Sequence, residues 1–237
     1  MYENKSQAEL YDRLYQDRKD YDAEAAEVTG FVRDRKKGAS SLLDVACGTG
    51  IHLAAFAKRF DRVAGLDMSE SMAAIASERL GGVPVHEGDM RTFELGETFD
   101  AVVCMFSSIG YLRTVEDLES AVRAMTGHLV QDGVLAIEPW YFPDTFIPGY
   151  VSTHAFKQEG QGISRVSHST REGTLTRMEI HYVVADSEEG ITHRSEIDYL
   201  TLFSREEYVN AFHKAGLDVE YVETAGGRPG FFLGTRR

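Results

Sequence analysis

The chain has 237 residues, of which 43% are hydrophobic and 27% charged, as in a soluble globular protein with one large domain or one domain with an insertion. Its net charge of −13 argues against a broad surface for nucleic acid, although a local basic pocket for one or two phosphates is compatible with it. Two cysteines form no disulfide framework and favour the cytoplasm, and the charged N-terminal segment predicts neither a signal peptide nor a membrane span.

The first part of the chain predicts helices followed by alternating strands and helices. Residues 7–36 have apolar side chains at helical spacing and predict one or two helices, broken by a charged run at 16–20. Five apolar segments then predict strands, at 41–46, 62–67, 83–86, 99–105 and 133–138. Three segments between them predict helices, at 50–59, 69–79 and 115–129. This alternation indicates a parallel sheet covered on both faces.

The pattern changes after residue 138. Prolines and a glycine interrupt the next ten residues, and 150–203 then reads as alternating strands with three turns, at 159–160, 171–173 and 188–190. A helix at 204–215 and two strands, at 218–223 and 230–235, return to the core as a hairpin-like pair. The predicted organisation is an α/β core of residues 1–138 and 204–237 with an antiparallel β insertion at 139–203.

A turn rich in small residues follows the first predicted strand, in the run Leu-Leu-Asp-Val-Ala-Cys-Gly-Thr-Gly at 42–50, and brings bare backbone close to a ligand. A dinucleotide site would need a third glycine at the position of Leu53, so a pyrophosphate is poorly supported. Asp44 precedes the turn, where a carboxylate would repel a diphosphate but suits the cationic methionyl part of S-adenosylmethionine. The pattern therefore favours this methyl donor over a nicotinamide or flavin.

Carboxylates also end the next two predicted strands. Asp67 can accept both ribose hydroxyls, or it can merely cap the helix that begins near Ser69. Asp89 can accept the adenine amino group while Met90 lies on the ring. Three acidic strand ends in successive units favour a cofactor site, with contacts expected from Asp44, Ala46, Gly48, Asp67, Met68, Asp89, Met90 and Met105.

Longer motifs make the chain resemble the N-methyltransferases of aminodeoxysugar biosynthesis. They lie at 43–50, 88–91, 105–110, 138–140, 165–169 and 176–179. The first two are shared with many methyltransferases, whereas the later ones are more specific, and the likeness covers almost the whole chain. The family dimethylates sugar amines attached to dTDP, for antibiotics such as macrolides. The resemblance implies a class I, Rossmann-like methyltransferase fold with a mostly parallel seven-stranded sheet, S-adenosylmethionine as cofactor, no metal and a homodimer.

The resemblance also implies roles for single residues. Tyr21 would reach the cofactor carboxylate from the N-terminal helices. The nucleotide sugar would be held by Tyr15, Trp140, Arg165, Ser167, Ser169 and Arg177, with Arg228 at the diphosphate. An aromatic face suits thymine and a guanidinium suits phosphate. The two strand arginines, Arg165 and Arg177, could instead pair with Glu172 or Glu179 in solvent.

The expected reaction is an in-line displacement in which a neutral sugar amine attacks the methyl group of the sulfonium. Orientation is then the main contribution of the protein. Tyr2 and Tyr111 are candidates for hydrogen bonds to the amine, while water can take its proton. Tyr141 stands where the family usually has a second tryptophan, and 226–230 also departs from the family pattern, so sugar and nucleotide preference stay open.

Three other functions stay open: methylation of a 4-amino sugar, O-methylation of another small metabolite, and non-catalytic binding of the cofactor or a nucleotide. An O-methyltransferase would need a firm base or a metal. The eight histidines lack metal-ligand spacing, so no metal site is expected.

Overall fold

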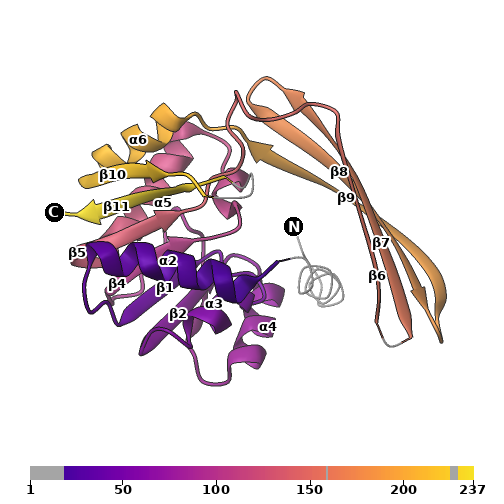
Figure 1. Ribbon diagram of the computed structural model, residues 1–237, viewed down its shortest axis with the longest axis horizontal. Coiled ribbons are helices and arrows are strands. Elements are labelled where there is room, and N and C mark those ends of the chain that lie inside the picture. The colour runs from indigo at the N-terminus through magenta and orange to yellow at the C-terminus, as the bar shows by residue number, and fades with distance from the viewer. Residues whose placement is uncertain (1–18, 159, 225–228) are drawn as a thin grey trace.

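Two β-sheets organise the computed structural model, which describes residues 19–158, 160–224 and 229–237 (Figure 1). The strands are β1 (Ser41–Val45), β2 (Arg62–Asp67), β3 (Val85–Glu87), β4 (Phe99–Cys104), β5 (Leu129–Ile137), β6 (Tyr150–Gln158), β7 (Gln161–Glu172), β8 (Leu175–Asp186), β9 (Gly190–Thr201), β10 (Leu217–Val222) and β11 (Phe231–Arg236). Within these ranges, a seven-stranded sheet has the order β10-β11-β5-β4-β1-β2-β3, and a four-stranded sheet has the order β6-β7-β8-β9. The larger sheet is parallel apart from β11, which runs antiparallel to β5 and β10. The predicted α/β fold with an antiparallel β insertion is therefore confirmed.

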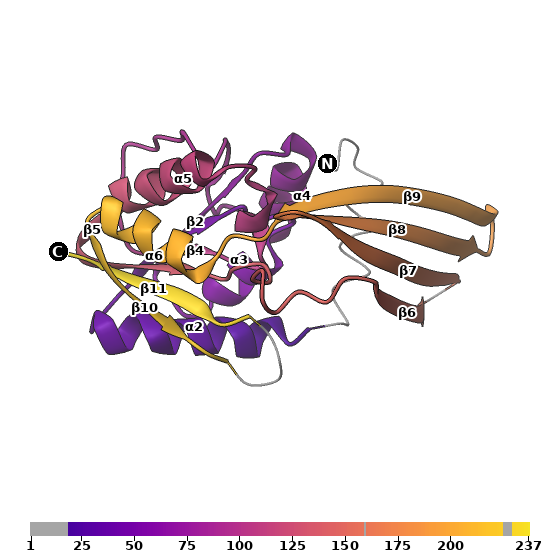
Figure 2. The same cartoon turned by 90° about the horizontal axis from the view of Figure 1, so that it is seen from above.

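Helices cover both faces of the larger sheet (Figure 2). They are α2 (Tyr21–Arg35), α3 (Ile51–Phe56), α4 (Glu70–Leu80), α5 (Val115–Gly127) and α6 (Arg205–Lys214), with a 3-10 turn η1 (Ser108–Tyr111) after β4. The buried side chains of α5 and α6 pack on one face, and those of α2, α3 and α4 on the other. Ser69 caps α4, and Ser204 forms a capping box with Glu207 at α6. None of the described helices is long and apolar enough to cross a membrane.

The start of β5 differs from its prediction. The strand begins at Leu129, whereas the sequence predicts a start at 133. After Leu129 has paired with Phe99, the pairing shifts, and the polar residues around Asp132, whose φ is 60°, bulge out of the regular ladder. The polar residues around Asp132 resemble a turn in the sequence, but they lie within β5.

The strands of the smaller sheet pair in continuous register over the described residues, so each side chain's position fixes its face. Tyr150, Ser169, Met178 and Asp198 lie in one row across the four strands. We call the face that carries this row the inner face. It includes Tyr150, Ser152, Arg165, Ser167, Ser169, Met178, Ile180, Tyr182, Glu196 and Asp198. The opposite, outer face includes Val151, Val166, Arg177, Glu179, Val183, Ile191 and Ile197.

Glycines with positive φ lie at the predicted turns of this sheet. They are Gly160 (78°), Gly173 (63°) and Gly190 (81°), a region of backbone space that side chains with a Cβ rarely enter. These glycines close the hairpins and thereby set the register that separates the two faces.

Candidate active site

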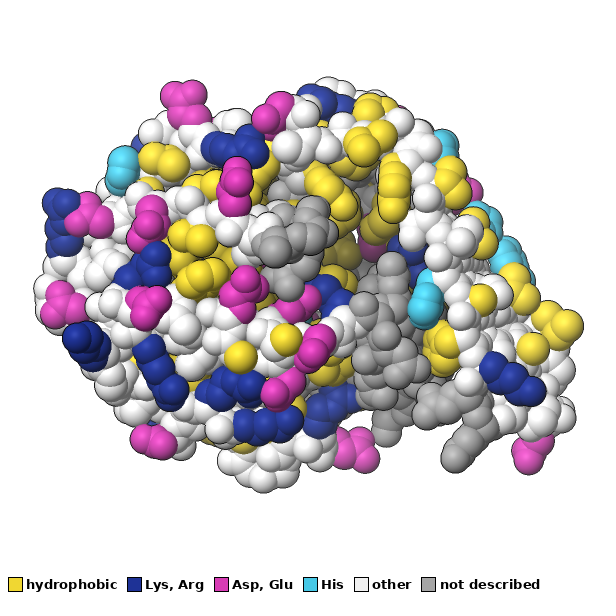
Figure 3. Space-filling view, in the orientation of Figure 1, with side chains coloured by type: hydrophobic (Ala, Val, Ile, Leu, Met, Phe, Trp, Pro, Cys, Tyr) yellow, Lys and Arg dark blue, Asp and Glu magenta, His cyan; other side chains and the backbone are white. Residues whose placement is uncertain are grey.

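A cavity of about 1040 Å³ lies where the carboxyl ends of the parallel strands meet the inner face of the smaller sheet. Its walls come from the turn after β1, the ends of β2 and β4, the segment after β5, and the strands β6 to β9. On the face drawn in Figure 3, charged side chains of both signs are interspersed over the core, and hydrophobic ones gather where the core faces the smaller sheet. The cavity lies at the carboxyl edge of an open α/β sheet, which is where such folds bind ligands.

The turn after β1 is held in an unusual backbone conformation. Ala46 has a φ of 59° and Gly48 a φ of 57°, and the Gly48 N–H donates a hydrogen bond of 2.8 Å to Asp67. A Cβ built on Gly48 would meet nothing within 4 Å, so its conformation, and not crowding, accounts for the glycine. Both residues line the cavity, as expected from the sequence.

Asp44 presents a buried carboxyl group to this cavity. Its side chain is 1% exposed, and neither carboxyl oxygen has a hydrogen-bond partner within the described part of the chain. Burial, together with the nearby Asp67, raises the pKa of Asp44 well above its usual range. A buried carboxyl group without a partner is costly. The site therefore suits a ligand that brings a cation, such as the α-ammonium of S-adenosylmethionine.

Asp67 and Asp89, the other two predicted carboxylates, also line the cavity, but each has protein partners. Asp67 accepts the backbone N–H groups of Gly48 (2.8 Å) and Ser69 (2.9 Å), and burial raises its pKa despite these bonds. Asp89 is paired with Arg91 at 2.5 Å, which lowers the pKa of Asp89. Asp67 therefore holds the two loops together and faces the cavity, whereas the cap of α4 is Ser69 and not Asp67.

Met68, Met90 and Met105 also line the cavity. Met68 is half exposed, whereas Met105 is buried at the end of β4. Their polarizable thioethers provide the apolar surface that an adenine or a sulfonium methyl group would contact.

The start of α2 covers another side of the cavity. Tyr21 lies edge-on to His52, with ring centroids 4.7 Å apart, and both line the cavity. His52 Nε2 lies 2.9 Å from Glu24 Oε2, and Lys19 Nζ lies 3.1 Å from the same oxygen. Lys19 also stands 4.0 Å from the centroid of the Phe106 ring. The sequence signal for Tyr21 came from resemblance alone, and the buried Glu24–His52 contact had no local signal.

The segment after β4 is constrained by a buried glutamate. Phe106 and Ser107 both have positive φ, 55° and 61°, which is uncommon for residues with a Cβ. Glu138 accepts the Phe106 N–H at 2.7 Å, and the Ser107 hydroxyl donates to the Pro139 carbonyl at 2.9 Å. These two hydrogen bonds hold the start of η1, and Tyr111 at the end of η1 lines the cavity.

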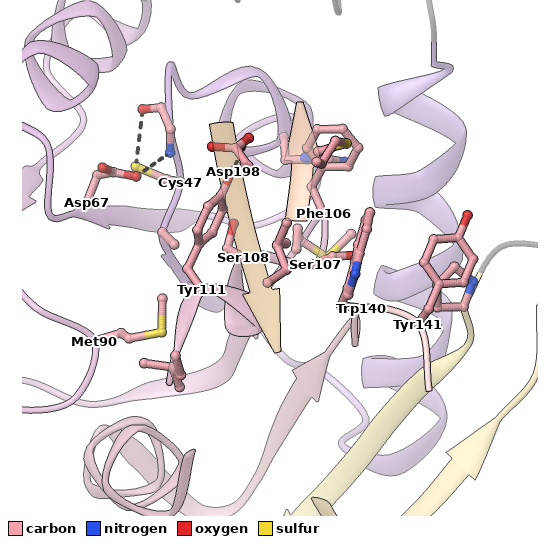
Figure 4. A pocket seen from close by; sticks show the side chains of 18 of the residues that line it. Cys47, Asp67, Met90, Phe106, Ser107, Ser108, Tyr111, Trp140, Tyr141 and Asp198 are labelled. Carbon is pink, nitrogen blue, oxygen red and sulfur yellow. Dashed lines mark hydrogen bonds between the residues drawn. The ribbon is translucent and has the colours of Figure 1, made fainter. Parts of the chain in front are cut away.

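The opposite wall carries the predicted nucleotide-sugar residues. Trp140 lies edge-on to Tyr141, with ring centroids 4.8 Å apart, and its buried indole N–H has no hydrogen-bond partner in the described structure. Arg165 is 3% exposed and donates to the Ser167 hydroxyl at 3.0 Å. Arg165, Ser167 and Ser169 all point from the inner face into the cavity. Figure 4 shows the aromatic part of this wall, Trp140 and Tyr141. Together with Arg165 and the two serines, they give the wall an aromatic face, a buried cation and hydroxyl groups.

Arg177 corrects the sequence prediction. It pairs with Glu179 at 2.9 Å on the outer face and is not among the residues that line the cavity. The physical reason is strand alternation: Arg177 lies opposite Thr170, one position out of step with the Ser169–Met178 pair of the inner face. The alternative considered for both arginines, a surface ion pair, thus holds for Arg177 and not for Arg165.

Tyr111 lines the cavity and donates a hydrogen bond of 3.1 Å to Asp198, a residue that the sequence did not single out. Three other predicted residues, Tyr2, Tyr15 and Arg228, lie outside the described residues. Among the described side chains, no group of three or more His, Cys, Asp or Glu could hold a metal ion.

The chain is similar to known methyltransferases over almost its whole length. Residues 42–133 match a family model described as a methyltransferase domain. The chain is 50% identical to dTDP-3-amino-3,4,6-trideoxy-alpha-D-glucopyranose N,N-dimethyltransferase of Streptomyces venezuelae, over 96% of each chain. It is 45% identical to dTDP-4-amino-2,3,4,6-tetradeoxy-D-glucose N,N-dimethyltransferase of Saccharopolyspora spinosa, over 97% of this chain and 92% of the relative.

A solved structure extends the comparison to the whole fold. The S-adenosylmethionine-bound amino pentose methyltransferase CalS10 of Micromonospora echinaspora, from calicheamicin biosynthesis, superposes with a TM-score of 0.90 at 47% identity. The match covers 96% of this chain and 97% of CalS10. Near full-length identity at this level, together with the shared fold, settles the relationship. The chain belongs to the S-adenosylmethionine-dependent N,N-dimethyltransferases of dTDP-linked aminodeoxysugars.

Proposed function

We propose that this protein adds two methyl groups, one after the other, to the amino group of a dTDP-linked aminodeoxysugar. The observation that carries the proposal is a single cavity with two different ends. One end has the buried, unpartnered carboxyl group of Asp44, and the other has Trp140 and the buried Arg165. A cationic cofactor and an anionic nucleotide sugar can therefore occupy one space, with the amine between them.

The chain's own residues mainly bind and orient the reactants. S-adenosylmethionine, when bound, supplies a methyl group activated by its sulfonium charge. Asp44 would hold the cofactor's ammonium, Asp67 its ribose hydroxyls and Asp89 its adenine amino group. Trp140 would stack on thymine and Arg165 would face the diphosphate. Alignment of the amine with the methyl group can account for much of the rate enhancement.

The test is mass spectrometry of dTDP-3-amino-3,4,6-trideoxyglucose incubated with the protein and S-adenosylmethionine. Two successive methyl additions are expected, with the monomethyl sugar as an intermediate. A nucleotide sugar with a hydroxyl in place of the amine is the control and should stay unmodified. If the amine is not methylated while calorimetry shows cofactor binding, the proposed substrate is wrong and the methyltransferase assignment stands.

A 4-amino sugar is the second candidate, because a 45% identical relative is named for one. The same assay with dTDP-4-amino-2,3,4,6-tetradeoxyglucose compares the two amine positions directly. A kcat/KM for the 4-amino sugar higher than that for the 3-amino sugar would assign this substrate instead.

We further propose a homodimer that forms through the outer face of the smaller sheet. Five of the exposed large apolar side chains lie on this face: Val151, Val166, Val183, Ile191 and Ile197. Monomers rarely expose large apolar patches, so a second copy of the chain is the proposed partner of this face. The two buried free thiols further support the proposed cytoplasmic location.

Sedimentation velocity on the wild type and on Val166→Asp tests the dimer. The wild type is expected to sediment as a dimer and Val166→Asp as a monomer. Ile147→Asp is the matched control, because Ile147 is exposed but lies outside this face. A monomeric wild type, or a dimer that survives Val166→Asp, would contradict the proposal.

A further inference from the structure

Tyr111 and Asp198 form a hydrogen-bonded pair inside the cavity. The Tyr111 hydroxyl donates to Asp198 Oδ2 at 3.1 Å, and both side chains line the cavity (Figure 4). Tyr111 ends η1 of the core, whereas Asp198 belongs to β9 of the smaller sheet. The pair therefore connects the core to the substrate-facing sheet at the cavity itself.

The backbone around this pair is tightly packed. A Cβ on Gly110 would lie 2.9 Å from the Cβ of Trp140 and 3.3 Å from Leu200 Cδ2, so η1 fits closely between them. The Thr201 hydroxyl also donates to the Leu112 carbonyl at 2.6 Å. These contacts hold η1 against β9 on both sides of the pair, so the tyrosine meets the carboxylate through a rigid backbone.

Asp198 lies among groups of both charges. Burial raises its pKa, whereas the hydrogen bond from Tyr111 and the positive charges of Arg165 and Arg113 favour its ionised form. Glu196, on the same face, accepts a separate hydrogen bond from Tyr182. In the Tyr111–Asp198 bond the hydroxyl donates and the carboxyl oxygen accepts, so the proton of this bond belongs to the tyrosine.

An amine that attacks a methyl group must direct its lone pair at that methyl group. A neighbouring hydroxyl that donates to the amine would occupy the lone pair and block the reaction. A neighbouring oxygen that accepts from an amine N–H leaves the lone pair available. The direction of the hydroxyl proton therefore decides whether a tyrosine beside the amine assists or inhibits transfer.

We propose that Asp198 is a positioning residue that accepts the hydrogen bond of the Tyr111 hydroxyl, so that the Tyr111 oxygen accepts an N–H of the sugar amine. This inference rests on the proposed aminosugar substrate. A neutral primary amine has two N–H groups, but the monomethyl amine has only one. The second methyl transfer thus depends more strongly on this acceptor than the first.

The experiment compares Asp198→Ala, Tyr111→Phe and the double variant on the aminosugar that the wild type methylates. Each single variant is expected to lower kcat of the second transfer about 10-fold, the value of one hydrogen bond, and to accumulate the monomethyl sugar. Because Asp198 acts through Tyr111, the double variant should be no slower than Tyr111→Phe. Effects that multiply in the double variant, or an unchanged ratio of monomethyl to dimethyl product, would overturn the inference.

Two further variants separate positioning from loss of structure. Asp198→Asn keeps an acceptor oxygen and should retain most of the second transfer, and a loss equal to that of Asp198→Ala would overturn the inference. Glu196→Ala also breaks a tyrosine–carboxylate bond, but Glu196 is not among the described residues lining the cavity, so the product ratio should not change. Wild-type activity tests the proposed substrate independently of the variants.

Discussion

Replacing Asp44 with asparagine should stabilise the cofactor-free protein and weaken its binding of cofactor. The folded chain buries this carboxyl group without a hydrogen-bond partner in the described structure, close to Asp67. A buried asparagine would also lack a partner, but it has no charge, so it avoids the cost that the raised pKa imposes on the carboxyl group, which we take as about 1–3 kcal/mol. For a chain of this size, 1 kcal/mol corresponds to about 2–4 °C in Tm, so we expect Tm to rise by about 2–12 °C.

The effect of Asp44→Asn depends on pH with a definite sign. Burial raises the pKa of Asp44 in the folded state. The proton-linked stability of the wild type is therefore complete below the unfolded pKa of about 3.9 and is lost as pH rises through the folded pKa. The asparagine variant lacks this loss. Its advantage in Tm should be small at about pH 5 and larger at about pH 8.

Thermal unfolding followed by circular dichroism, with and without S-adenosylhomocysteine, measures both effects. The ligand carries the same α-ammonium, so losing its charged hydrogen bond should weaken binding by about 1.5–3 kcal/mol, or roughly 10- to 150-fold. Asp67→Asn is the matched control, since both Asp67 oxygens accept backbone N–H groups and an amide can replace only one of them. This control should lower Tm. If Asp44→Asn did not raise Tm without ligand at pH 8, or bound ligand as the wild type does, the reasoning would be refuted.

Three smaller tests address other parts of the fold. Arg165→Ala should raise KM for the nucleotide sugar about 30-fold or more, because it removes a buried cation from the cavity, whereas Arg177→Ala on the outer face should change KM less than about twofold. Steady-state kinetics would contradict this if both variants behaved alike. Gly50→Ala should lower the free energy of unfolding in urea by about 1–3 kcal/mol, because Gly50 has a φ of 79° and a Cβ there would lie 2.9 Å from Ala76 Cβ. An unchanged urea midpoint would refute this prediction. Burial raises the pKa values of the Cys47 and Cys104 thiols. At pH 8, mass spectrometry should therefore find iodoacetamide labels on them only after the protein is unfolded. Labelling of Cys104 in the native protein would contradict this expectation.

The sequence predicted the cofactor side of the cavity better than the substrate side. Asp44, Asp67 and Asp89 each lie at or just beyond the carboxyl end of a strand, and the carboxyl ends of parallel strands meet at one edge of a sheet. Local sequence therefore contains most of that geometry. The bulge at Asp132 was missed because polar residues within a strand resemble a turn until the neighbouring strand is known.

The substrate side depends on relations between distant segments. Arg165 and Arg177 have similar local surroundings, and only the register of β7 against β8 places one inside the cavity and the other outside. Tyr111 and Asp198 are 87 residues apart, and nothing near either residue indicates the other. Their contact follows from how η1 packs against β9, which becomes visible only in three dimensions.

The strict alternation of the smaller sheet also limits how its sequence can change over evolutionary time. A single inserted or deleted residue within β7 would exchange the faces of every side chain between that change and the next turn. Arg165 and Ser167 would then point away from the cavity, and Val166 would enter it. Length changes inside these strands are therefore expected in pairs or together with a compensating bulge, whereas turns that preserve the pairing can vary more freely. Homologous sequences should record this constraint as a preference for even-numbered gaps.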